Sequence, residues 1–258
     1  MTYVGQSVRR FEDHRLLTGQ GSYVDDMKLP GLLNAVVLRS LHAHANIRSI
    51  GVSPATRLPG VVAVFTAADI QDLAVEIPTR TNTGADEFSP PKHPLLASDK
   101  VCYVGQAVAV LIAEDPYTAA DALDQIVVDY EILPALTDPY AALEPDAMII
   151  HPDQGSNVSL RTLNGGGDLD GAFAQADHVV RQTYQVQRLA PAPMEPRGLI
   201  ADYDSQADLL TVWDSTQHPH EVREHLVHLL GRTEEGIRVV APDVGGGFGE
   251  KASLFPEE

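Results

Sequence analysis

The stretch that decides the fold class is Ala107-Val108-Ala109-Val110-Leu111-Ile112-Ala113, which is apolar at every position. A strand that is buried on both faces has this composition. Asp115-Pro116 follows, and an aspartate cap with a proline at the first helical position opens a helix that runs to Leu123. The segment Ile126-Val127-Val128-Asp129-Tyr130 then returns as a strand. This strand–helix–strand order predicts a mixed α/β (α+β) fold.

Further strands and helices are expected on both sides of this region. Apolar runs and alternating patterns predict strands, whereas a capping residue followed by amphipathic spacing predicts a helix. The predicted strands cover residues 32–39, 61–65, 178–188, 199–203, 209–213 and 237–240, and the predicted helices cover 168–176 and 219–230. A stretch rich in proline and acidic residues from Asp138 to Asp146 is the expected boundary, so that the two domains cover residues 1–138 and 139–258.

Composition and charge narrow the functions open to this chain of 258 residues. With 44% hydrophobic and 21% charged residues, it has the make-up of a globular protein. Its formal net charge of -18 repels phosphate backbones, which argues against nucleic acid as a general partner. No window approaches the roughly 18 apolar residues of a membrane span, and the first residues do not resemble a signal peptide. A cytoplasmic protein with no membrane span is therefore expected.

The only cysteine, Cys102, limits the metal and redox chemistry of the chain. One thiol forms no intrachain disulfide, and it cannot hold an iron–sulfur cluster that needs several thiolates. Because Cys102 lies at the edge of an apolar stretch, a structural thiol is favoured over a reactive one.

The most informative local feature is the glycine-rich run from Gly245 to Gly249. Positions without a hindering side chain let backbone N–H groups approach a ligand closely. The run is not a Walker loop, because no Gly-Lys-Ser/Thr follows it, and its spacing differs from a dinucleotide-binding fingerprint. Composition alone leaves a mobile loop and a cofactor cradle equally open.

The histidines suggest two metal sites, and neither is supported. His42 and His44 would share one face of a strand, but no third ligand is signalled, so a solvent-facing pair is favoured. His220 and His225 superficially resemble the pair of a zinc-protease helix, but a spacing of five turns them about 140° apart. No direct protein ligand to a metal is predicted.

Glu195 lies in a proline-framed corner, two residues before Arg197. The carboxylate could form a structural ion pair or face a ligand. The structural interpretation is favoured, because a buried carboxylate is usually paired.

Several segments together, in order along nearly the whole chain, resemble the large subunit of the molybdenum hydroxylases. This is the family of xanthine dehydrogenase, aldehyde oxidase and carbon monoxide dehydrogenase. The segments that carry the resemblance are Arg10–Asp26, Leu38–Ala45, Asp99–Gln106, Val128–Ala135, Met194–Gly198, Trp213–Gln217, Val244–Lys251 and Phe255–Glu258.

The resemblance implies a fold and a set of site residues. Residues 1–138 would be the hammerhead α/β domain, and residues 139–258 the beginning of an incomplete molybdopterin-binding domain. Gln217 corresponds to the glutamine that hydrogen-bonds an oxygen ligand of molybdenum in this family. The cofactor would lie against Gly246, Gly247, Phe248 and Gly249. An amide can orient an oxo group, and glycines let the backbone approach a bulky cofactor.

The resemblance also implies an oxidoreductase that hydroxylates a small substrate, such as an aldehyde or an N-heterocycle, with water as the oxygen source. The molybdopterin cofactor would be shared with a C-terminal molybdenum-binding segment or chain, while an iron–sulfur subunit and an FAD subunit would carry the electrons away. The family's catalytic glutamate lies outside this sequence. We therefore expect one piece of a split subunit or a truncated product, inactive by itself.

Two further points follow from the resemblance. Ala252 occupies the position that resembles a substrate-holding glutamate in purine-oxidising members. Because this carboxylate is absent, a purine substrate is less favoured. The alternative from another functional class is a non-catalytic assembly piece that retains the family fold.

Overall fold

The computed structural model describes residues 3–73, 76–77 and 87–258. The chain divides into two compact units, each described by itself. The central unit comprises Leu33–Ala190, and the terminal unit comprises the segment up to Leu32 together with Pro191–Pro256 and Glu258.

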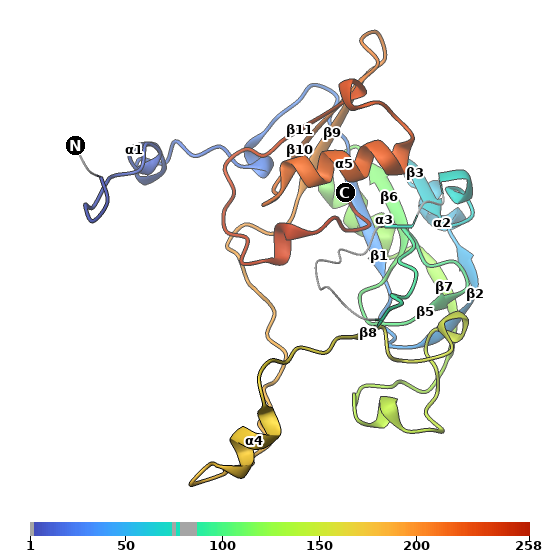
Figure 1. The fold of residues 1–258 in the computed structure, drawn as a ribbon. Helices are drawn as coiled ribbons and strands as arrows, with labels where there is room; N and C mark the ends of the chain where they lie inside the picture. The colour runs from blue at the N-terminus through green and yellow to red at the C-terminus, as the bar shows by residue number, and fades with distance from the viewer. Residues whose placement is uncertain (1–2, 74–75, 78–86) are drawn as a thin grey trace. The chain divides into compact units, whose positions relative to one another are not determined.

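The centre of the central unit is β6 (Ala107–Ala113), which lies between β1 (Asn34–Arg39) and β3 (Val61–Thr66) and is antiparallel to both (Figure 1). Successive side chains of a strand point to opposite faces. Accordingly, Leu111 packs with the buried alanines of α3 (Pro116–Leu123), while Val108 packs in a second apolar cluster. The predicted strand buried on both faces is therefore confirmed.

The predicted cap of α3 is also present. The Asp115 carboxylate accepts hydrogen bonds from the backbone N–H groups of Tyr117 at 2.9 Å and Thr118 at 3.0 Å. The hydroxyl of Thr118 donates to the same carboxylate at 2.6 Å, and these bonds lower the pKa of Asp115. Two of the unpaired N–H groups at the helix start are thereby satisfied.

A second antiparallel sheet of the central unit has β2 (Ala45–Gly51) between β5 (Lys100–Val101) and β7 (Val127–Ile132). The strand after α3 therefore joins a different sheet from β6, where Val128 and Tyr130 pack on the cluster of Val108. The strand–helix–strand order does not form a parallel crossover here. Of the residues described, this unit also contains α2 (Ser53–Thr56), β4 (Glu87–Phe88), β8 (Leu160–Arg161) and α4 (Leu169–Ala174), together with short 3-10 turns.

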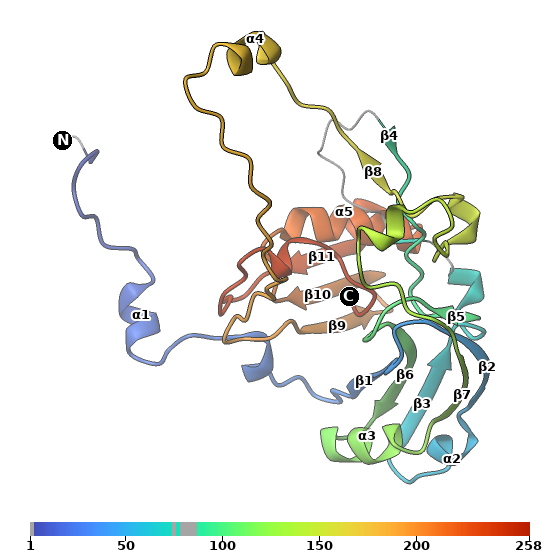
Figure 2. The ribbon, with the colours of Figure 1, turned by 90° about the horizontal axis from the view of Figure 1, so that it is seen from below.

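In the terminal unit, β10 (Leu209–Asp214) pairs antiparallel with β9 (Leu199–Asp204) and parallel with β11 (Ile237–Val240). The helix α5 (Pro219–Leu230) connects the two parallel strands and covers one face of the sheet, with Val222 and Leu226 buried (Figure 2). The carboxyl ends of parallel strands meet at one edge of a sheet, so the segments after β10 and β11 lie together. A short helix, α1 (Asp13–Leu17), precedes the sheet in the sequence.

The strand predicted over residues 178–188 is wrong. This segment has no regular secondary structure, and its apolar side chains are exposed, with Val180 at 85% and Val186 at 79%. An alternating pattern forms a strand only where a neighbouring strand accepts its backbone hydrogen bonds. Among the residues that the structure describes, this segment has no such partner.

In the described part of the chain, every helix is too short or too polar to cross a membrane.

Candidate functional site

The candidate site of the terminal unit forms where the chain leaves β10 and β11. Gln217 follows β10, and the loop from Gly245 to Lys251 follows β11. The Gln217 N–H donates to the carbonyl oxygen of Lys251 at 2.8 Å, and the Gly249 N–H donates to Oε1 of Gln217 at 2.9 Å. Gln217 and the glycine run, which the sequence placed 28 or more positions apart, are therefore in direct contact.

The contact with Gly249 fixes which end of the Gln217 amide faces outward. A backbone N–H can only donate, so the group that it meets is the amide oxygen. The side chain is exposed, and within residues 3–73, 76–77 and 87–258 its Nε2 has no hydrogen-bond partner. Gln217 thus presents an oriented, available N–H donor.

Gly247 lies directly against the Gln217 side chain. A Cβ at this position would lie 2.5 Å from Cδ and 2.7 Å from Cγ of Gln217, and would also overlap Oε1. Real Cβ atoms do not approach other atoms this closely, so the Gln217 side chain would have to leave. The φ of Gly247 lies outside the left-handed region, so the close approach to Gln217, and not the backbone conformation, is what favours glycine here.

The same loop has an unusual backbone at Phe248. Its φ is 52°, a left-handed value that bulky residues rarely adopt, and its side chain is 76% exposed. Backbone outliers of this kind are enriched at active sites and ligand-binding loops. Within the described chain, the N–H groups of Gly246, Gly247 and Phe248 have no acceptor, so three successive donors are available to a ligand.

A largely buried ionic cluster, which we call the Glu195–Ser215–Lys251 triad, contacts the first and last residues of this loop. The Lys251 ammonium is fully buried and donates to Oε2 of Glu195 at 2.9 Å and to Oγ of Ser215 at 2.7 Å. Ser215 Oγ donates to the same carboxylate oxygen at 2.6 Å, and the Gly245 N–H does so at 2.7 Å. Burial alone would raise the pKa of Glu195, but these hydrogen bonds outweigh it and leave the pKa lowered.

Sequence reasoning missed this triad. It selected Arg197 as the possible ion-pair partner of Glu195, whereas the carboxylate binds Lys251, 56 positions later. Arg197 instead pairs with Glu258 at 3.2 Å and stacks over the Phe255 ring at 3.8 Å. Lys251 closes the glycine-rich motif, which was the one available signal for its role.

Asp214, the last residue of β10, is 1% exposed, and neither of its carboxylate oxygens has a hydrogen-bond partner in the described structure. Burial, reinforced by the nearby Glu258 carboxylate, raises the pKa of Asp214 to about 7. Between about pH 4 and pH 7, Asp214 is therefore protonated in the folded protein and ionised in the unfolded chain. The free energy of unfolding accordingly falls as the pH rises through this interval.

Replacing Asp214 by asparagine is expected to abolish this loss of unfolding free energy. The pKa shift corresponds to a loss of roughly 4 kcal/mol, reached above about pH 7. Urea unfolding at pH 5 and pH 8 measures it: the variant should gain stability over the parent at pH 8 and much less at pH 5. Asp202→Asn, on the exposed part of β9, controls for the change in net charge. An Asp214→Asn variant with the same relative stability at both pH values would refute the assignment.

The loop before the glycines is tied to the N-terminal segment. The Asp243 carboxylate accepts two hydrogen bonds from the Arg15 guanidinium, one of them at 2.7 Å from Nη2, and one from the Ser22 N–H at 2.7 Å. The bonds from Arg15, together with that from Ser22, lower the pKa of Asp243 to about 2. A charged bidentate pair of this kind fixes the geometry of both partners.

The other candidates of the sequence do not form a metal site. His42 and His44 are not the predicted solvent-facing pair, because His44 is 4% exposed and its Nδ1 lies 2.8 Å from the Pro134 carbonyl oxygen. The chain has not yet entered β2 at these positions, so the rings do not share a strand face. Burial raises the pKa of the half-buried Cys102 thiol, which fits a structural role. The described residues contain no group of three metal-binding side chains.

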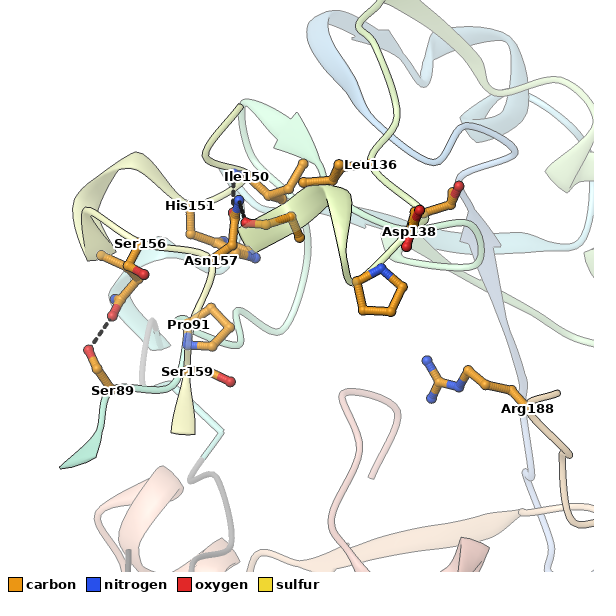
Figure 3. A pocket seen from close by; sticks show the side chains of 14 residues that line it. Ser89, Pro91, Leu136, Asp138, Ile150, His151, Ser156, Asn157, Ser159 and Arg188 are labelled. Carbon is orange, nitrogen blue, oxygen red and sulfur yellow. Dashed lines mark hydrogen bonds between the residues drawn. The ribbon is translucent and has the colours of Figure 1, made fainter. Parts of the chain in front are cut away.

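A pocket of about 490 Å³ lies within the central unit. Asp138 and Arg188 line one end, and Ser89 and Ser156 the other (Figure 3). Asn157 in its wall is already engaged, since its side chain bonds to the backbone of Ile150, Ala142 and Met148. None of the predicted site residues lines this pocket, so the loop after β11 remains the candidate site.

Comparison with known families identifies both parts of the chain. Residues 18–134 match the aldehyde oxidase and xanthine dehydrogenase a/b hammerhead domain, and residues 150–258 match the molybdopterin cofactor-binding domain. The chain belongs to the molybdenum hydroxylase family. The resemblance and the fold class inferred from the sequence are confirmed, whereas the domain limit at 138/139 and the site residues stay predictions.

Relatives in the molybdenum hydroxylase family match nearly the whole chain. It is 42% identical to the large subunit of nicotine 6-hydroxylase from Paenarthrobacter nicotinovorans over 99% of this chain and 31% of the relative. It is 39% identical to the carbon monoxide dehydrogenase large chain of Afipia carboxidovorans over 98% and 32%, respectively. Quinoline 2-oxidoreductase from Pseudomonas putida 86 is structurally similar, with a TM-score of 0.91 and 41% identity over 99% of this chain and 32% of that one. The chain thus spans about a third of the length of these relatives.

Proposed function

We propose that this chain forms part of the cofactor-facing region of a molybdenum hydroxylase that oxidises a small substrate with water as the oxygen source. The observation that carries the proposal is the Gln217 amide, whose oxygen is held by the Gly249 N–H while its NH₂ group faces outward. When bound, the molybdenum cofactor would supply the two-electron oxidation of the substrate carbon.

The residues of this chain fit such a group. Gln217 Nε2 would donate a hydrogen bond to the cofactor and so orient it. The available N–H groups of Gly246, Gly247 and Phe248 would lie against it, where the missing side chains of the glycines leave room. Because these donors are already positioned by the loop, they need no reorganisation when charge develops on the bound group.

An N-heterocycle is the favoured substrate class. Two of the similar proteins, nicotine 6-hydroxylase and quinoline 2-oxidoreductase, bear the names of such compounds. Ala252 offers no carboxylate to hold a purine, which supports a less polar ring. Aldehydes and carbon monoxide are the alternatives, since relatives of those kinds also match the chain.

Other polypeptide segments would complete the enzyme. One cysteine cannot hold the iron–sulfur clusters that remove the electrons, so these and FAD would lie on partner chains. The remaining molybdenum-binding segment would supply the general base. The isolated chain would then be inactive.

The test is to isolate the complex that contains this chain from a host that makes the cofactor. We expect stoichiometric molybdenum and pterin, turnover of quinoline or nicotine with a dye acceptor, and ¹⁸O from labelled water in the product. A complex that lacks molybdenum and pterin when intact would instead support the non-catalytic assembly role. If the complex turns over an aldehyde or carbon monoxide but no N-heterocycle, the proposed hydroxylase reaction stands and the proposed substrate class is overturned.

A further inference from the structure

We propose that Lys251 is a positioning residue, whose buried side chain and backbone together hold Gln217 and the glycine loop in register. The proposal rests on the proposed function for its consequence in turnover, but the positioning itself can be measured without it.

Lys251 binds three successive residues after β10, each through a different contact. Its Nζ donates to Oγ of Ser215 at 2.7 Å. Its carbonyl oxygen accepts from Oγ1 of Thr216 at 3.2 Å and from the N–H of Gln217 at 2.8 Å. The turn that presents the Gln217 side chain is therefore fastened to one residue of the neighbouring loop.

Glu195 extends this arrangement to the start of the loop. Its Oε2 accepts from Lys251 Nζ at 2.9 Å and from the Gly245 N–H at 2.7 Å. The far end of the glycine run meets the Gln217 amide through the Gly249 N–H at 2.9 Å. The loop is thus held at Gly245, at Gly249 and at Lys251. Gln217 contacts the last two, Gly249 through its side chain and Lys251 through its backbone N–H.

Charge and burial explain why these contacts define one geometry. The Lys251 side chain is 0% exposed and that of Glu195 is 14% exposed, so water cannot replace a partner that the Lys251 ammonium loses. An ammonium without its carboxylate in such a place is strongly unfavourable, which penalises loop conformations that separate the two. An apolar side chain could fill the same space but would not specify the direction of the Gln217 amide.

The test uses the assembled complex and the variant pair Lys251→Met and Glu195→Gln, made together so that no buried charge is left unpaired. Hydrogen–deuterium exchange at the Gly249 amide, in complex from molybdenum-depleted cells, reports the contact with Gln217 directly. We expect exchange at least roughly 10-fold faster than in the parent, because the contact now opens locally. If the pair variant does not assemble, exchange at the Gly249 amide is measured in Ser215→Ala instead. This variant keeps both charges but removes the hydroxyl that Lys251 and Glu195 share.

A double-mutant cycle in the loaded complex separates positioning from general stability. The pair variant should lower kcat by roughly 10- to 100-fold with little change in KM, and should lower it little further when Gln217→Ala is also present. Val212→Ala, a change at a buried position of β10 outside the triad, should lower the melting temperature without changing the Gly249 exchange rate relative to its neighbours.

Each outcome decides one question. Unchanged exchange at Gly249 in the pair variant would overturn the positioning role, as would a kcat loss that is the same with and without Gln217. Normal turnover of Gln217→Ala by itself would remove Gln217 from the site, and a complex without molybdenum and pterin would overturn the proposed function. In either case the exchange measurement would still decide whether Lys251 holds the loop.

Discussion

Replacing Gln217 by alanine is expected to lower the turnover of the assembled enzyme about 100-fold, the usual effect of removing one preorganised donor. The folded protein loses one exposed hydrogen bond to Gly249, which costs about 1 kcal/mol at most. Steady-state kinetics, melting temperature and molybdenum content are measured side by side. We expect kcat to fall while the other two stay close to those of the parent.

Gln217→Glu is the matched control for this variant. A carboxylate still accepts the hydrogen bond from the Gly249 N–H, but it lacks the NH₂ group that faces outward. If the donor is what matters, Gln217→Glu should be as impaired as Gln217→Ala. Full turnover in either variant removes Gln217 from the site, and a large drop of the melting temperature in both supports a purely structural role.

Gly247→Ala should have an effect on turnover of similar size, roughly 100-fold, because it expels the Gln217 side chain from its position. The new methyl group would overlap Oε1, Cδ and Cγ of Gln217, and these are the three nearest atoms that it meets. Kinetics and the Gly249 exchange rate measure the displacement. Gly166→Ala is the control, since a Cβ there meets nothing within 4 Å.

The decisive comparison combines Gly247→Ala with Gln217→Ala. In the Gln217→Ala background, Cδ and Oε1 are gone, so the added methyl group should cause little further loss of activity or stability. Losses that multiply in the double variant would show that Gly247 acts by another route, such as direct contact with the cofactor.

Local sequence patterns predicted the individual elements well where one physical cue dominated. β6 is apolar throughout because both of its faces are buried, and α3 carries its cap in Asp115-Pro116. The helix α5 begins at Pro219, as expected, and ends before Gly231, whose φ of 59° is left-handed. Each of these signals is contained in a few neighbouring residues.

Pairing over long distances could not be predicted in the same way. The segment 178–188 alternates like a strand, but alternation does not supply the neighbour that a ladder needs. The partner of Glu195 lies 56 positions away, while Arg197, two positions away, pairs elsewhere. The contact between Gly247 and Gln217 depends on β10 and β11 being parallel, which the α5 crossover allows but no single motif encodes.

The position of β6 in the chain has a consequence for how the protein is made. Val108 and Leu111 belong to two different apolar clusters, and their partners include Ala45 and Ala55, which are synthesised much earlier. Neither cluster can close until β6 has emerged from the ribosome, so the preceding strands wait with their apolar faces in water. Contacts between residues far apart in sequence also form slowly. We therefore expect the nascent chain to depend on chaperones until α3 is complete, and a ribosome stalled just before β6 to hold a chain that is readily digested by protease.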